Sequence, residues 1–297
     1  MLALRLAMGL GLGYALLVLL AWRFQERMAF PAPRADVPDP RRVGVENGER
    51  VALASADGTK LVGWYLAPRA PDLHRPPPTS PALLWFYGNG ENVAAIWPVV
   101  RAFQPPGTAV LVVDYPGYGG SGGRTTEAGL YAAADAAWAA LVARRDVDPQ
   151  RISVYGRSLG SAVATYTAAH HPAAGLVLES PFTSAAAMAR HLYALVPRFI
   201  LTLQLDNVAN VKSIHCPILV FHGDADRLVP PAMGLAVAAA AAGPVEVVLI
   251  HGAGHNETYA IGGREYRDKL RDFIAGAGRG DGGRGRPTLP PSLAPRP

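Results

Sequence analysis

Apolar residues in the centre of this chain are grouped in short, uninterrupted runs. Runs such as ALLWFY, AVLVVDY and PILVFH are almost entirely apolar. Such runs are typical of strands buried on both faces of a parallel sheet, because neither face meets water. On this basis we expect strands at about residues 49–55, 60–67, 82–87, 108–114, 151–155, 174–179, 216–222 and 245–250.

Longer stretches rich in Ala and Leu separate the later runs and have the composition of helices. Strands that alternate with helices after one initial hairpin predict an open α/β sheet. We therefore expect an α/β fold in which a mostly parallel eight-stranded sheet is flanked by helices. The expected helices lie at about residues 91–103, 126–144, 159–170, 230–242 and 258–275.

A charge-free apolar segment lies near the N-terminus, between Arg5 and Arg23. Residues 6–22 read LAMGLGLGYALLVLLAW and would span about 26 Å as a helix, close to the thickness of a thin bilayer core. A cleavable signal peptide is the alternative, and it would end in small residues in an A-x-A pattern. Here the segment ends in WRFQ, which is typical of a membrane interface. We therefore predict a retained single-pass transmembrane anchor over residues 1–24.

The charges around this anchor leave the side of the membrane open. Arg23, Arg27 and Arg34 follow the apolar segment, and such an excess favours the cytoplasm for the folded body. Short N-terminal anchors often insert in the opposite direction. We predict a single-pass membrane protein and leave the side of the folded body undetermined.

Composition divides the rest of the chain into three parts. Residues 25–45 are rich in Pro and are predicted to be a linker, and residues 46–275 are predicted to form the folded domain. Residues 276–297 cannot bury a core and are predicted to be a disordered tail. The net charge of +5 lies at the two ends, and a nearly neutral body argues against nucleic acid as a partner.

The chain has one cysteine, Cys216, so no intrachain disulfide or cysteine-based metal site can form. Its position before PILVF predicts a buried small side chain. The histidines show no metal-ligand spacing and there is no H-E-x-x-H, so we predict neither a metal nor a cofactor. His222 ends a predicted strand and is expected to be a histidine of the core.

A candidate nucleophile follows the strand expected at 151–155, where functional residues of such sheets are placed. The chain there reads Gly156-Arg157-Ser158-Leu159-Gly160, a G-x-S-x-G motif. A nucleophile on a sharp strand-to-helix turn needs Gly neighbours, because Cβ atoms would collide with the turn. We predict Ser158 as the nucleophile and the Leu159 N–H as an oxyanion donor at the helix N-terminus. The alternative is a serine that only caps the helix.

A serine nucleophile needs a base, and two acids and two histidines compete for the supporting roles. Asp224 and Asp226 follow PILVFH, and His251 and His255 follow VEVVLI. His255 lies beyond two glycines, in a loop that can carry it to Ser158. We predict His255 as the base and Asp226 as the acid that holds the imidazole tautomer. Asp224 remains the alternative acid, and His251 is expected to be a structural loop residue.

A second oxyanion donor is expected in the loop after the third strand. The chain there reads YGNGEN, and Gly88 and Gly90 allow the backbone to approach a substrate closely. We predict the N–H of Asn89 as this donor, with a plain turn as the alternative. A G-x-G-x-x-G at residues 117–122 is not followed directly by a helix, so we expect a loop beside the site and no dinucleotide.

With these motifs, the chain resembles the serine α/β-hydrolase superfamily over about residues 20–275. More narrowly, it resembles the membrane-anchored group related to the animal ABHD protein depalmitoylases and to fungal and bacterial homologues. The motifs that carry this resemblance are FQERMAFP, YGNGEN, DYPGYGGSGG, YGRSLGSAVA, LESPFTS, HCPILVFHGDADRLVP and HGAGHN.

The resemblance implies an α/β-hydrolase fold and the same site that the residues predict. It places the nucleophile at Ser158, the acid at Asp226, the base at His255 and the oxyanion donors at Asn89 and Leu159. The group usually has His where this chain has Tyr87. Residues 181–213 leave little room for a large cap domain, so we expect an open site.

These observations predict a serine hydrolase that cleaves carboxylic esters or thioesters of apolar acyl groups near a membrane. One alternative is an aminopeptidase-like amide hydrolase, which would need acidic groups to hold the substrate amine and a larger cap. Another is a non-catalytic binding protein, since a fold does not fix a function. Acyl chain length and oligomeric state are not determined by the sequence.

Overall fold

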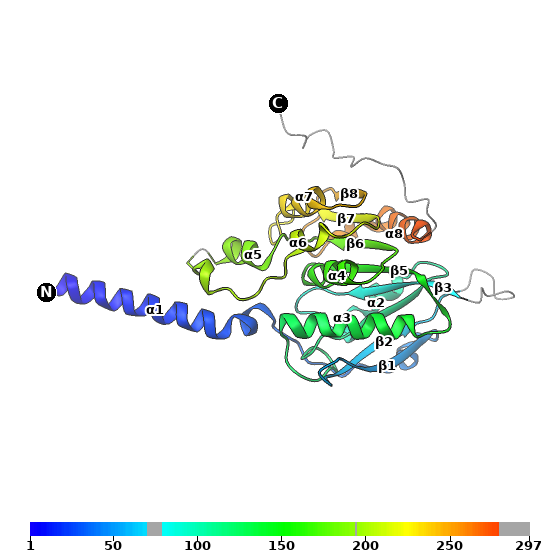
Figure 1. Cartoon of the computed structure of the whole chain (residues 1–297), viewed down its shortest axis with the longest axis horizontal. Coiled ribbons are helices and arrows are strands. Elements are labelled where there is room, and N and C mark those ends of the chain that lie inside the picture. Colours follow the sequence, from blue (N-terminus) through cyan, green and yellow to red (C-terminus); the bar gives the residue numbers. More distant parts are fainter. Residues whose placement is uncertain (70–78, 194, 279–297) are drawn as a thin grey trace, which may run out of the picture.

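The computed structural model describes residues 1–69, 79–193 and 195–278 (Figure 1). Within them lies one eight-stranded sheet in the order β1-β2-β4-β3-β5-β6-β7-β8. β2 pairs antiparallel with β1 and β4, and the other neighbours are parallel, which confirms the predicted sheet. The strands are β1 Gly48–Ala54, β2 Lys60–Leu66, β3 Ser80–Phe86, β4 Ala109–Val113, β5 Val147–Arg157, β6 Gly175–Glu179, β7 Ile218–Gly223 and β8 Val245–Ile250.

Helices cover both faces of the sheet because its central strands are apolar on both sides. Every residue of β4, β6 and β7 is buried, whereas the edge strand β1 alternates with exposed positions. The helices are α1 Leu2–Ala29, α2 Val93–Phe103, α3 Glu127–Val142, α4 Leu159–His170, α5 Ala185–Leu192, α6 Asn207–Val211, α7 Pro231–Ala240 and α8 Thr258–Gly276, with short 3₁₀ turns η1 Pro40–Val43 and η2 Arg198–Ile200.

Aromatic contacts show which helices share a face. α3 and α4 lie in front of the sheet in Figure 1, and the rings of Tyr131 and Tyr166 stack between them at 4.0 Å. Phe103 of α2 meets Tyr266 of α8 edge to face, with ring centroids 5.4 Å apart. Such ring pairs add to the stabilisation from burial and fix the helices against one another.

Residues 181–213 differ most from the prediction, because they contain α5 and α6, which no apolar periodicity indicated. α5 has no buried residue, because the apolar side of this short helix, with Ala185, Met188 and Leu192, lines a pocket instead of packing in the core. Its start is nevertheless marked, since the Ser184 side chain accepts a hydrogen bond from the Ala187 N–H. The described residues of this segment form no large cap, as expected. Cys216 is partly buried, and burial raises the pKa of its thiol to about 11.

Helix α1 extends away from the folded body (Figure 1). Its 28 residues are long and apolar enough to cross a membrane. The C-terminal end of α1 is different, since Ala21 in the helix and Phe30, the residue directly after it, are buried against the body. The N-terminal part of the helix is therefore exposed, whereas its C-terminal part packs on the folded domain.

The topology fixes where a site can form. β3 is followed by β4 on one side, whereas β5 is followed by β6 on the other side, so the chain diverges between β3 and β5. Loops that leave the carboxyl ends of such strands separate and open a crevice. The loop after β3 contains Asn89 and the turn after β5 contains Ser158, so both predicted parts of the site flank this crevice.

Candidate active site

The turn between β5 and α4 holds Ser158 in a strained backbone conformation, with φ 50° and ψ −115°. Residues other than Gly rarely adopt positive φ, and such strain gathers at functional sites. A Cβ on Gly156 would lie 2.2 Å from the Gly160 carbonyl oxygen, and one on Gly160 would lie 2.2 Å from the Phe86 carbonyl oxygen. The G-x-S-x-G pattern is therefore required by the turn. The Ser158 hydroxyl makes no cap hydrogen bond to α4.

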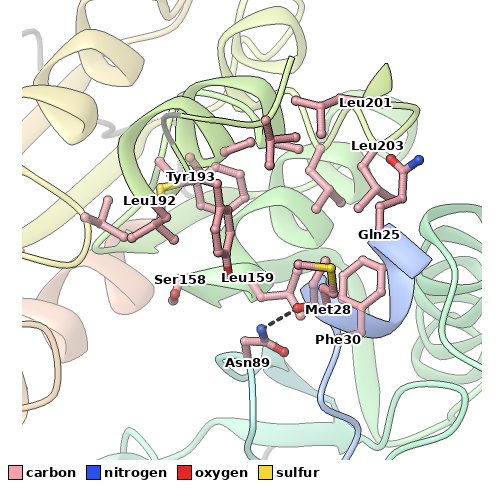
Figure 2. A pocket seen from close by; sticks show the side chains of 18 of the residues that line it. Gln25, Met28, Phe30, Asn89, Ser158, Leu159, Leu192, Tyr193, Leu201 and Leu203 are labelled. Carbon is pink, nitrogen blue, oxygen red and sulfur yellow. Dashed lines mark hydrogen bonds between the residues drawn. The ribbon is translucent and has the colours of Figure 1, made fainter. Parts of the chain in front are cut away.

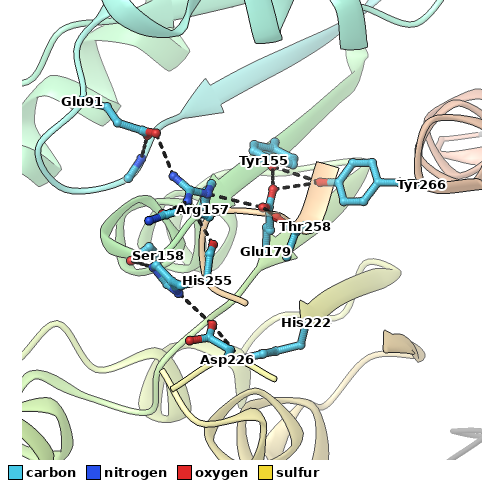
Figure 3. A network of polar contacts seen from close by, with 12 residues as sticks. Glu91, Tyr155, Arg157, Ser158, Glu179, His222, Asp226, His255, Thr258 and Tyr266 are labelled. Atoms are coloured by element: carbon cyan, nitrogen blue, oxygen red, sulfur yellow. Dashed lines mark hydrogen bonds and ion pairs between the residues drawn. The ribbon is translucent and has the colours of Figure 1, made fainter. Parts of the chain in front are cut away.

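Three side chains from separate loops form a row in Figure 3. The Oγ of Ser158 lies 3.0 Å from Nε2 of His255, and Nδ1 of His255 lies 2.7 Å from Oδ2 of Asp226. Ser158 follows β5, Asp226 follows β7 and His255 follows β8. The structure thus brings together the three residues that the sequence singled out as nucleophile, acid and base.

The carboxylate of Asp226 is buried and densely hydrogen-bonded. Its Oδ1 accepts the backbone N–H groups of Leu228 at 3.0 Å and Val229 at 2.8 Å. Burial alone raises the pKa of this carboxyl, but donors from His222, His255 and the Val229 N–H outweigh burial and hold the pKa well below its usual range. Asp226 is therefore an anion whose second oxygen, Oδ2, lies 2.7 Å from Nδ1 of His255.

The competing acid and histidine pair with each other, away from Ser158. Nδ1 of His251 lies 2.7 Å from Oδ2 of Asp224, and the His251 side chain is 99% exposed. His222 is buried as expected, and its Nε2 lies 2.8 Å from the Val229 carbonyl oxygen. Among the described residues, its Nδ1 has no hydrogen-bond partner.

The loop after β3 presents Asn89 beside Ser158, and both line the same pocket. No described residue accepts a hydrogen bond from the Asn89 backbone N–H. Leu159 is the first residue of α4, so its N–H has no partner within the helix. Gly90 adopts φ 78°, which favours Gly and lets the loop turn tightly. Asn89 and Leu159, the residues predicted to supply the two oxyanion donors, therefore both line the pocket.

The side chain of Asn89 ties this loop to two other segments. Its Oδ1 accepts a hydrogen bond from the Tyr118 hydroxyl at 2.6 Å. Its Nδ2 donates to the carbonyl oxygen of Ala29, the last residue of α1, at 2.7 Å. The base of the apolar helix is thus in direct contact with the candidate oxyanion loop, a link that no motif indicated.

Tyr87, where the ABHD group usually has His, points away from the pocket. Its ring is fully buried, and its hydroxyl donates to Oδ1 of Asp114 at 3.0 Å and accepts the Tyr115 N–H at 3.0 Å. Burial raises the pKa of Tyr87 well above its usual value. Tyr87 therefore does not obstruct access to Ser158.

The glycine-rich loop at residues 117–122 wraps around the carboxylate of Asp114. Oδ2 of Asp114 accepts the Gly120 N–H at 3.1 Å, and a Cβ on Gly119 would lie 1.9 Å from the same oxygen. The Ser121 hydroxyl donates to the Asp114 carbonyl oxygen. These glycines are explained by close packing within the protein, beside the site.

Arg157, the residue before the nucleophile, was not predicted and connects the parts of the site (Figure 3). Its guanidinium donates to Oε1 of Glu91 at 2.8 Å, to the carbonyl oxygen of His255 at 3.1 Å and to Oδ1 of Asn256 at 2.7 Å. Glu91 in turn accepts the Gly88 N–H at 2.7 Å. One buried side chain therefore joins the loop after β3 to the loop that carries His255.

Beneath Arg157 lies the carboxylate of Glu179, which is completely buried. It lies 3.3 Å from Nε of Arg157 and accepts hydrogen bonds from Tyr155, Thr258 and Tyr266. Burial opposes the charge on Arg157, but the carboxylates of Glu179 and Glu91 outweigh it and keep the arginine pKa above its usual range. The sequence signal was an acid at the end of a fully apolar strand, in GLVLE.

A pocket of about 260 Å³ opens beside Ser158 (Figure 2). Met28 and Phe30 at the end of α1 form one side, and Leu192 and Tyr193 at the end of α5 form the other. Its described lining is mostly apolar and has no acidic side chain. Among the described residues, no cluster of three or more His, Cys, Asp or Glu side chains could hold a metal ion. The site is suited to an apolar group next to a reactive hydroxyl.

Sequence relatives cover most of this chain. An uncharacterized protein of Mycobacterium tuberculosis (strain ATCC 25618 / H37Rv) is 36% identical over 258 residues, which are 86% of this chain and 89% of the relative. The alpha/beta hydrolase domain-containing protein 17B of Homo sapiens is 34% identical over 169 residues, 56% of each chain. This chain thus matches about half the length of that human relative, and the resemblance to the ABHD group is confirmed.

Solved structures share the fold at low sequence identity. The acetyl xylan esterase from Paenibacillus sp. R4 has a TM-score of 0.65 at 20% identity, covering 79% of this chain and 85% of the esterase. The Pyrococcus furiosus esterase Pf2001 has a TM-score of 0.66 at 20% identity, covering 83% and 99%. Residues 81–210 also match the family described as alpha/beta hydrolase fold. The chain therefore has the α/β-hydrolase fold.

Proposed function

We propose that this protein is a serine hydrolase that cleaves carboxylic esters or thioesters through an acyl-serine intermediate. The observation that carries the proposal is the row formed by Ser158, His255 and Asp226, with contacts of 3.0 and 2.7 Å. A serine hydroxyl becomes a nucleophile when a positioned base accepts its proton. The strained turn supports the proposal, because it presents Ser158 at the floor of the pocket.

In the acylation step, Oγ of Ser158 attacks the substrate carbonyl carbon while Nε2 of His255 accepts the hydroxyl proton. The carbonyl oxygen becomes an oxyanion, and the N–H groups of Asn89 and Leu159 donate to it. The Asp226 carboxylate accepts the Nδ1–H of His255, which fixes the tautomer and stabilises the imidazolium. The C–O or C–S bond then breaks, and His255 gives its proton to the leaving alcohol or thiol.

In the deacylation step, water replaces the leaving group. His255 accepts a proton from the water as its oxygen attacks the acyl carbon of Ser158. The same two N–H groups hold the second oxyanion. Breakage of the ester bond to Oγ, with return of the proton from His255, releases a carboxylic acid and restores the enzyme.

The two alternatives receive no support from the described pocket. An aminopeptidase-like enzyme would need acidic side chains near Ser158 to bind an amine, and the described lining has none. A binding protein with a blocked site would need Tyr87 or residues 181–213 to cover the serine. Tyr87 is buried elsewhere, and Ser158 lines the open pocket.

We further propose that residues 6–22 are a retained membrane anchor within an N-terminal segment of residues 1–24. The apolar length of α1 supports the proposal, as does the packing of its C-terminal end on the body. The linker at 25–45 and the domain at 46–275 complete this division, and most of the tail at 276–297 lies outside the described residues. The arginines after the apolar segment favour a cytoplasmic domain.

The proposal is tested with purified full-length protein and a series of p-nitrophenyl esters and acyl thioesters from acetyl to palmitoyl. We expect hydrolysis by the wild type and its loss in Ser158→Ala. Rapid quenching followed by mass spectrometry should place an acyl adduct on the peptide that contains Ser158. The proposal is wrong if folded wild-type protein hydrolyses none of these substrates.

A further inference from the structure

The pocket beside Ser158 continues into a second, wider groove that runs along α1. The pocket holds about 260 Å³ and the groove about 790 Å³. The lining residues common to both are Ala21, Met28, Leu192, Tyr193 and Val196. A continuous apolar path therefore leads from the candidate nucleophile to the side of the helix that is apolar enough to cross a membrane.

Two segments that are distant in sequence form the walls of this path, which we call the acyl groove. One wall is α1 from Gly13 to Met28, and the other includes Leu192 and Val196. The described lining of the wider groove has no charged side chain, and Tyr193 is its one residue with a polar side-chain group. In addition to its proposed role as a membrane anchor, α1 therefore forms one wall of a groove that leads to Ser158.

Polar contacts at several levels hold the two walls together. The Tyr14 hydroxyl donates to the Leu195 carbonyl oxygen at 3.1 Å. Lower on the helix, Nε2 of Gln25 donates to the Ile200 carbonyl oxygen at 3.2 Å, and Oε1 of Gln25 accepts the Thr202 N–H at 2.8 Å. These hydrogen bonds connect the two walls, and the side chains that line the groove between them are mostly apolar.

The tip segment, residues 195–201, exposes large apolar side chains next to the apolar part of α1. Leu195 is 72% exposed and Phe199 is 86% exposed. Exposed apolar side chains gathered on one side of a protein mark a surface that is covered by a partner or a membrane. Because Leu195 contacts Tyr14 within the proposed anchor, the same bilayer that receives α1 would also receive the tip segment.

We propose that the acyl groove binds the hydrocarbon chain of a long-chain acyl ester embedded in the bilayer. The chain enters sideways between α1 and the tip segment, and its carbonyl reaches Ser158 at the inner end. This inference rests on the proposed function and adds a binding site in which the anchor helix is one wall. The contact between Ala29 and Asn89 places the inner end of that wall against the oxyanion loop.

The test uses full-length protein in phosphatidylcholine nanodiscs with p-nitrophenyl acetate and p-nitrophenyl dodecanoate. Ala21→Trp puts a large side chain at the junction of the pocket and the groove, since Ala21 lines both. We expect the ratio of kcat/KM for dodecanoate over acetate to fall by about sixtyfold, because roughly three methylenes are excluded and each is worth about fourfold.

The matched control is Ala15→Trp, the same change on the same helix at an exposed position that lines neither cavity. It should keep the wild-type ratio. Ala21→Trp could instead displace α1, so Val196→Trp blocks the groove from the opposite wall and should lower the ratio in the same direction. Labelling by a small fluorophosphonate verifies that each variant retains a folded site.

The outcomes separate the two proposals. If wild-type protein hydrolyses neither ester, the proposed function fails. If it hydrolyses both and the two groove variants keep the wild-type ratio, the acyl groove proposal is overturned while the proposed function stands. A fall in the ratio for both groove variants, with Ala15→Trp unchanged, supports the lateral route.

Discussion

Two Asp–His pairs lie close together in this chain and share the same internal geometry. In the pair of Asp226 with His255 and in the pair of Asp224 with His251, Nδ1 lies 2.7 Å from Oδ2. In the first pair, both side chains are largely buried, and Asp226 also accepts two backbone N–H groups. In the second pair, the His251 side chain is almost fully exposed. His255 also reaches the hydroxyl of Ser158, and among the described residues His251 contacts only its own acid through its ring nitrogens.

The difference between the pairs shows that a good Asp–His hydrogen bond is not enough to identify a catalytic group. Around an exposed pair, water screens the attraction and stabilises either protonation state. Around a buried pair, fixed donors hold the carboxylate as an anion, and a proton accepted by the histidine is stabilised without solvent rearrangement. Burial and the third partner therefore favour Asp226 and His255 for the proposed roles of acid and base.

The largest expected contrast is between the two histidines. His255→Ala should lower kcat for a short-chain ester by about 10⁵- to 10⁶-fold, because Ser158 loses its base. His251→Ala should leave kcat unchanged, since the His251 side chain is in solvent. Steady-state kinetics on both purified variants checks this contrast. Equal losses would mean that the exposed pair also contributes to turnover.

The two acids should differ somewhat less. Asp226→Asn should lower kcat by about 10⁴-fold, because the amide no longer holds the correct imidazole tautomer. Asp224→Asn serves as the matched control and should retain wild-type kcat. A large loss in Asp224→Asn with activity retained in Asp226→Asn would reverse the assignment of the acid.

The comparison of buried with exposed charges extends to two arginines. Arg157→Gln leaves Glu179 without its cation in a fully buried site, which should cost about 3–5 kcal/mol, or about 10 °C in the unfolding midpoint. Arg271→Gln removes an exposed partner of Asp268 and Asp272 and should not measurably change the midpoint. Thermal unfolding in detergent measures both variants, and equal midpoints would contradict a structural role for Arg157.

The smallest expected effect is a dependence of stability on pH. The pKa of Asp226 is lowered in the folded state, so its carboxylate stabilises the fold above the unfolded pKa of about 3.9. That contribution is lost as the pH falls below this value towards the lower folded-state pKa. The unfolding midpoint of wild type should therefore exceed that of Asp226→Asn most at neutral pH, and the difference should shrink in acid. A difference that grows in acid would contradict the sign.

The parts of the site that could be predicted are those in which one residue type is fixed by local backbone geometry. Gly156 and Gly160 are required by the turn, and the ends of apolar strands marked where Ser158, Asp226 and His255 should lie. The sheet was predictable for a similar reason, because strands buried on both faces read as uninterrupted apolar runs. These features depend on neighbours within a few residues.

The parts that could not be predicted depend on contacts between distant segments. Arg157 occupies the variable position of the motif, and its partners Glu91 and Asn256 lie 66 and 99 residues away. The pocket wall from α1 joins residues that are also distant in sequence, as Gln25 and Thr202 show with a separation of 177. No periodicity or spacing encodes such pairs, so the structure was needed to find them.

The most direct test of the central claim is labelling with a fluorophosphonate probe, which reacts with an activated serine. Wild type, Ser158→Ala, His255→Ala and His251→Ala are compared as folded full-length proteins. The account predicts labelling of wild type and His251→Ala, no labelling of Ser158→Ala and strongly reduced labelling of His255→Ala. Absence of labelling in folded wild type, or labelling that persists in Ser158→Ala, would contradict the account.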